Sequence, residues 1–125
     1  MRIPKEPPRD IRERAFAYAL RAIRLYQSLA GSKNGAGWII GRQYLRAATS
    51  IGANIEEAQS GESRADFIHK LAVAQKEARE SHYWLRLLAS SGIVAEASLQ
   101  PLMRETEELI SVVTAIIITT KSKLE

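Results

Sequence analysis

The stretch from Thr49 to Leu71, T-S-I-G-A-N-I-E-E-A-Q-S-G-E-S-R-A-D-F-I-H-K-L, predicts two amphipathic helices joined by a short turn. Gly61 is expected to end the first helix, because glycine often follows a helix C-terminus. Ser63, with Asp66 three residues later, loosely fits a capping box that opens the second helix. Small and apolar residues at four-three spacing extend both helices away from the turn. They are Tyr44, Ala48, Ile51, Ile55 and Ala58 before it, and Phe67, Leu71, Ala74, Ala78, Ser81, Leu85 and Leu88 after it.

Two further seams with the same spacing flank this pair of helices. They are formed by Ile11, Ala15, Tyr18, Ala22, Leu25 and Leu29, and by Leu99, Leu102, Thr106, Leu109, Ile110, Val113, Ile116 and Ile117. The β-branched segment from Val112 to Thr120 locally prefers strand, but it continues the phase of the last seam and has no partner strand. We therefore predict helices at about 10–30, 38–60, 63–90 and 97–122, after an extended segment, 1–9, that contains three prolines. Four long helices with short connections predict a single all-α domain, an antiparallel up-down-up-down four-helix bundle.

The first and the fourth helix carry more apolar surface than one bundle core can bury. The additional residues are Phe16, Leu20 and Ile23 on the first helix, and Val112, Ala115 and Ile118 on the fourth. A helix that is apolar nearly all round is normally covered by another surface. We therefore expect the protein to form a homo-oligomer.

The composition excludes several classes of protein. The chain has 125 residues and no cysteine, so it holds no disulfide and no zinc–cysteine site. Its N-terminus lacks the apolar core of a signal peptide. The longest apolar run, Leu109 to Ile118, is interrupted by two hydroxyl residues and is far shorter than the ~20 residues that span a bilayer. We expect a cytoplasmic protein with no membrane partner.

The net charge of +4 is unevenly distributed along the chain. Residues 1–24 contain seven basic and three acidic residues, whereas residues 93–125 contain three basic and five acidic ones. Arg14, Arg21 and Arg24 cluster on one side of the first helix, and Arg42 lies on the second. A solvated helix face is one interpretation of these arginines. The other is a surface that contacts RNA or DNA phosphates, with binding that depends on salt and hardly on sequence.

A second stripe, polar and charged, runs beside each of the two central seams. The residues that we assign to this structural and assembly network are Gln43, Arg46, Asn54, Glu57, Arg64, Asp66, Lys76, Glu77, Glu80 and Trp84. Charges inside a packed helix pair must be partnered, because an unpaired buried charge costs several kcal/mol. Arg46, Arg64, Lys76 and Arg79 are available partners for Glu57, Glu77 and Glu80. The network is expected to fix the helix register or a subunit interface.

Enzyme chemistry finds little support in the sequence. A di-iron bundle needs a Glu-x-x-His motif from each of two helices, and only Asp66-x-x-His69 is comparable here. The second histidine, His82, falls on a different side of its helix. No nucleophile turn or Ser/His/Asp arrangement is present, and the glycine-rich segment 31–37 lacks the Gly-Lys-Ser/Thr of a phosphate-binding loop. We predict no catalytic residues, no metal and no cofactor.

Several of these segments resemble one known family. They are R-A-F-A-Y-A-L-R-A-I-R-L-Y-Q from Arg14 to Gln27, T-S-I-G-A-N-I-E-E-A from Thr49 to Ala58, S-R-A-D-F-I-H-K-L from Ser63 to Leu71, and K-E-A-R-E-S-H-Y-W-L-R-L-L from Lys76 to Leu88. The chain resembles the bacterial four-helix-bundle proteins that are also called 23S rRNA intervening-sequence proteins. Many members have N-I-A-E-G where this chain has N-I-E-E-A, so it resembles a subgroup.

The resemblance implies an antiparallel bundle, commonly assembled as a homopentamer, with no established enzymatic activity. Some members are encoded within rRNA intervening sequences. A related accessory protein of diversity-generating retroelements is a basic pentamer that binds nucleic acid and a reverse transcriptase. We therefore predict a non-enzymatic oligomeric scaffold that contacts RNA or DNA. The alternatives are a protein-interaction module that binds no nucleic acid, and a metal-dependent bundle enzyme.

Overall fold

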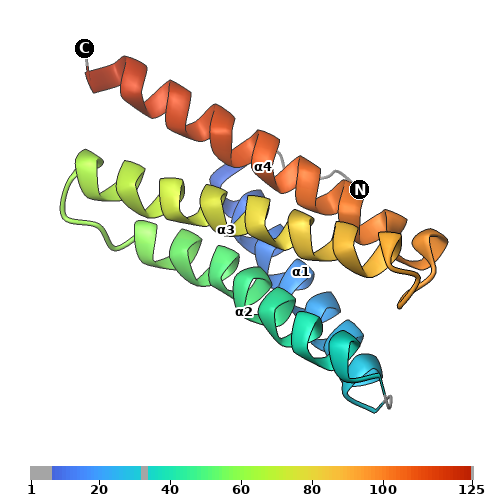
Figure 1. Cartoon of the computed structure of the whole chain (residues 1–125). Helices are drawn as coiled ribbons and strands as arrows, with labels where there is room; N and C mark the ends of the chain where they lie inside the picture. Colours follow the sequence, from blue (N-terminus) through green and yellow to red (C-terminus); the bar gives the residue numbers. More distant parts are fainter. Residues whose placement is uncertain (1–6, 32–33, 125) are drawn as a thin grey trace, which may run out of the picture.

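The protein is an all-helical bundle in the computed structural model, which describes residues 7–31 and 34–124. Its helices are α1 (Pro7–Ala30), α2 (Gly35–Ala58), α3 (Arg64–Ser90) and α4 (Glu96–Leu124). Figure 1 shows each helix running back along the one before it, with α2, α3 and α4 side by side and α1 crossing behind α3. This is the predicted antiparallel four-helix bundle, and the described residues contain no strand.

The predicted seams form its core. Every seam residue of α2 that was named above is buried. The seam residues of the other helices are buried too, apart from Leu25, Phe67, Ile110 and Ile116, which are half-buried. Tyr18 and Tyr44 are the largest fully buried side chains, and their rings meet edge to face with centroids 6.4 Å apart. The β-branched segment is helical, because burial of Val113 and Ile117 in the core outweighs its local preference for strand.

The helix starts differ from the predicted ones for local reasons. α1 begins at Pro7 rather than at residue 10, because proline fits a first helical turn, where its missing N–H needs no partner. The predicted extended segment 1–9 is therefore wrong for residues 7–9, and residues 1–6 lie outside the described residues. α2 begins at Gly35, three residues early, because the Asn34 side chain caps it by accepting a hydrogen bond of 2.9 Å from the Gly37 N–H. Ser63 caps α3 as predicted, accepting a bond of 3.1 Å from the Asp66 N–H.

Glycines let α1 and α2 approach closely. A Cβ on Gly41 would lie only 2.9 Å from Leu29 Cδ1, so the two helices touch tightly there. At Gly52 the nearest α1 atoms, on Ala15, would lie 3.6 Å from an added Cβ, which is ordinary van der Waals contact. The α1–α2 hairpin is therefore held at a fixed distance near its loop, and that geometry positions the arginines described next.

Candidate nucleic-acid interface

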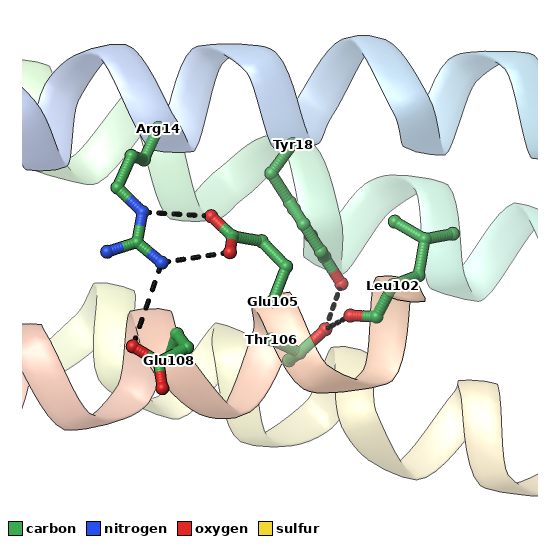
Figure 2. A network of polar contacts seen from close by, with 6 residues as sticks. All are labelled: Arg14, Tyr18, Leu102, Glu105, Thr106 and Glu108. Atoms are coloured by element: carbon green, nitrogen blue, oxygen red, sulfur yellow. Dashed lines mark hydrogen bonds and ion pairs between the residues drawn. The ribbon is translucent and has the colours of Figure 1, made fainter. Parts of the chain in front are cut away.

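Arg14 is committed to an ion pair across the bundle. Its Nε and Nη2 atoms donate to the two carboxylate oxygens of Glu105 on α4, at 3.0 and 2.8 Å, and Nη2 also lies 3.9 Å from Glu108 (Figure 2). Such a two-pronged pair is geometrically specific. The guanidinium therefore fastens α1 to α4, and its charge is already balanced before any phosphate arrives.

A buried chain of hydroxyl groups lies in the core one helical turn further along α1. Thr106 donates to the Leu102 carbonyl at 2.7 Å, so its hydroxyl accepts from Tyr18 at 2.6 Å (Figure 2). Tyr44 in turn donates to the Tyr18 hydroxyl at 3.0 Å. Burial raises the pKa of both tyrosines above 10.0, so both phenols stay protonated at neutral pH. This chain links α1, α2 and α4 in the core and serves the fold rather than binding.

Arg21 and Arg24 occupy the other end of α1, beside the start of α4. Arg24 is exposed and Arg21 is partly exposed. Together with Ser98 and Pro101 they line a shallow hollow of about 300 Å³. Within residues 7–31 and 34–124 neither arginine has an acidic partner within ion-pair distance.

Arg42 lies on the outer side of α2, where its guanidinium carbon is 5.0 Å from the centre of the Trp38 ring. It lines a hollow of about 430 Å³ that we call the basic hollow. Its lining includes Tyr26 of α1 and, from α2, Ile39, Arg42, Gln43, Arg46 and Thr49. Arg42 and Arg46 are one helical turn apart and both are exposed. The predicted arginines thus fall into three places: an ion pair, a shallow hollow beside α4, and the basic hollow on α2.

Apolar side chains remain on the outside of the bundle, as the excess apolar surface predicts. On α1 they are Phe16, Leu20 and Ile23, which are 65%, 40% and 37% exposed and which we call the apolar flank. On α4, Ile118 is 62% exposed. A separate apolar groove of about 540 Å³ lies between α3 and α4. Its lining includes Phe67 of α3 and Val112 and Ile116 of α4. No other chain is present to cover these surfaces, so the expected homo-oligomer stays a prediction.

Comparison with known proteins places the chain in a family. The family model described as 23S rRNA-intervening sequence protein matches residues 9–115, which include most of all four helices. The chain belongs to this family. It is also similar to the crystal structure of a protein of unknown function from the S23 ribosomal protein family of Bacteroides thetaiotaomicron. The two are 34% identical with a TM-score of 0.85, over 90% of this chain and 98% of the other. No curated protein sequence matches the chain.

Arg46 of this family member contacts Gln43, a member of the predicted polar network, and also lines the basic hollow together with Arg42, so it joins the candidate arginines. Its only side-chain bond among the described residues is 3.1 Å long and goes to the neutral Gln43 Oε1. One feature of the sequence could have revealed this. Residues 14–55 contain six basic residues and no Asp or Glu, so every charged residue of this segment is basic. The charge comparison above ended at residue 24, inside this basic segment, and therefore did not reveal it.

The remaining network residues have other partners than the basic residues that were predicted for Glu57, Glu77 and Glu80. Glu57 pairs with Lys70 at 2.7 Å, a partner that was not predicted, and the Trp84 Nε1–H donates to Glu80 at 3.1 Å. Asn54 donates to the Ser50 carbonyl, while Arg64 donates to the carbonyl of Lys123. Asp66, Lys76 and Glu77 lack an ion-pair partner within the described part of the chain, and Glu77 is half-buried. Whether this stripe meets a second subunit stays a prediction.

Metal chemistry gains no support from the arrangement. Among residues 7–31 and 34–124, no group of three His, Asp or Glu side chains could hold a metal ion. His69 is exposed, and the Nε2 atom of His82 lies 2.9 Å from a Glu107 carboxylate oxygen on α4. No described helix is long and apolar enough to cross a membrane.

Proposed function

We propose that this family member is a non-enzymatic, homo-oligomeric accessory or scaffold protein that binds RNA or DNA. The observation that carries the proposal is the surface of the α1–α2 hairpin, where Arg21, Arg24, Arg42 and Arg46 have no acidic partner among the described residues. Phosphates are attracted to such a surface because binding releases counterions and breaks no existing ion pair.

Self-assembly is supported by the apolar flank of α1 and by Ile118 on α4. Large apolar side chains gathered on a surface are typical of contacts with another protein. A homopentamer is the assembly that the family resemblance implies. Repeated copies of one basic surface would raise the overall affinity for a long nucleic acid, because later contacts become intramolecular.

The test is a titration of fluorescently labelled RNA and DNA with the purified protein, followed by anisotropy. We expect binding at about 50 mM salt that weakens steeply towards about 200 mM, as phosphate contacts do. The protein must first be treated with nuclease, so that nucleic acid from the expression host does not occupy the site. The ratio of ultraviolet absorbance of nucleic acid to that of protein shows whether any remains bound. Absent binding at the lowest salt would refute the proposal.

A second candidate, a protein-interaction module that binds no nucleic acid, is favoured by the apolar groove between α3 and α4. Its lining of Phe67, Val112 and Ile116 suits an apolar side chain of a protein partner better than a phosphate. Capture of a protein partner that survives nuclease treatment, and that Ile116→Glu abolishes, would favour this alternative.

A further inference from the structure

The basic hollow combines unbalanced positive charge with aromatic surface. Arg42 and Arg46 project from successive turns of α2, and the nearest acidic residues along the chain are Glu13 and Glu56. The single contact of Arg46, with Gln43, leaves its charge intact. Neither guanidinium group forms an ion pair within the described residues, so both charges can attract phosphates, in contrast to Arg14, whose charge is balanced by α4 carboxylates.

Trp38 lies next to the hollow, outside its lining, and is linked to it through Arg42. Its side chain is 40% exposed although indole rings are usually buried, and Arg42 stacks over it at 5.0 Å. Tyr26 of α1 contributes a half-buried ring to the lining of the hollow itself. A nucleobase can stack on an indole face or on a guanidinium plane, but only when it is not already stacked within a duplex.

We infer that the basic hollow and the adjacent Trp38 bind single-stranded nucleic acid, with Arg42 and Arg46 contacting successive phosphates and the indole ring stacking on a base. This inference rests on the proposed function and specifies the form of its ligand and the residues of its site. Contacts of this kind are made to the backbone and to base faces, so binding is nearly independent of sequence and RNA and DNA strands both fit.

The experiment compares a fluorescein-labelled single strand of mixed sequence, as RNA and as DNA, with the same strand annealed to its complement. The test variant is Arg42→Gln/Arg46→Gln. The matched control is Arg79→Gln/Arg86→Gln, which removes the same charge from exposed positions of α3. Circular dichroism and light scattering verify that both variants keep the wild-type fold and molar mass.

We expect the wild type to bind either single strand more tightly than the duplex. The test variant should lose about 1.4 from the slope of log affinity against log salt, since each phosphate contact in a single strand contributes ~0.7. Trp38→Ala should weaken binding about tenfold with an unchanged slope, and Trp38→Phe should restore most of the loss, because stacking is independent of salt. The control variant should retain a nearly unchanged slope.

Tryptophan fluorescence gives a direct test of the stacking contact. Trp84→Phe leaves Trp38 as the only tryptophan of the chain, and its emission should be quenched by the single strand and not by the duplex. Equal binding by test and control variants, or equal affinity for duplex and single strand, would overturn the inference while leaving the proposed function in place. No binding of any nucleic acid by the wild type would overturn both.

Discussion

Replacing Tyr18 by phenylalanine perturbs the bundle at the centre of its buried hydroxyl chain. The Tyr18 hydroxyl accepts from Tyr44 and donates to Thr106, and all three residues are 0% exposed. Without it the Tyr44 O–H has no acceptor and Thr106 loses its donor, and water does not reach either group. An unsatisfied buried polar group costs about 1–3 kcal/mol, so Tyr18→Phe should lower the free energy of unfolding by about 2 kcal/mol.

Tyr44→Phe is the matched control, because Tyr44 stands at the end of the chain. Its loss leaves the bond from Tyr18 to Thr106 in place, so the expected destabilisation is about 1 kcal/mol. The double variant should cost less than the sum of the two single changes, because it removes the donor that Tyr18→Phe leaves unpaired.

The measurement is urea unfolding followed by circular dichroism at a fixed protein concentration, since assembly makes apparent stability depend on concentration. Thermal unfolding of the same variants gives a second measurement, in which each kcal/mol of destabilisation should lower Tm by about 3 °C for a chain of this length. The reasoning is refuted if Tyr44→Phe destabilises as much as Tyr18→Phe, or if the double variant is simply additive.

Three further predictions concern pH, packing and charge. Burial raises the pKa of Tyr18 and Tyr44 above 10.0, so the stability that these phenols contribute is complete below pH 10.0. Above pH 10.0 the free energy of unfolding should fall by about 1.4 kcal/mol per pH unit for each tyrosine, because only the unfolded state loses the proton. Phenolate absorbance of these two rings should therefore appear only together with loss of helical circular dichroism. Gly52→Ala should stabilise the protein by up to about 1 kcal/mol, because alanine favours a helix and its Cβ fits. Gly41→Ala should stabilise the protein less, or destabilise it, because the added Cβ would lie 2.9 Å from Leu29 Cδ1. Thermal unfolding of the two variants distinguishes them. Arg14→Gln should lower stability by about 1 kcal/mol and leave RNA affinity unchanged, because the guanidinium already serves the α4 carboxylates; a loss of affinity without a loss of stability would contradict this.

The core could be predicted from sequence because helical periodicity is a local property. The spacing of Ile51, Ile55 and Ala58 places them on one face whatever the partner, and all three are buried. The same periodicity placed Val113 in a helix against its local preference. Exposed apolar residues such as Phe16 were found by the same route, since they fall outside the seam.

What the sequence left open were contacts between distant parts of the chain. Nothing near Arg14 in sequence indicates that Glu105, 91 residues away, takes its charge. The partner of Glu57 was not predicted either, because Lys70 reaches it across the turn between α2 and α3. The sequence placed Arg46 and Gln43 in one polar stripe, which their hydrogen bond agrees with, but it did not indicate that both line the same hollow as Arg42.

Light scattering of the purified, nuclease-treated protein over a wide range of dilution gives its molar mass. This measurement most directly tests whether copies of the chain associate through the apolar flank. If copies cover one another's apolar flank, the molar mass should be at least twice the 13.9 kDa of one chain, and Leu20→Glu should lower that molar mass. A compact particle of 13.9 kDa at every concentration, with Phe16, Leu20 and Ile23 in contact with water, would contradict the account.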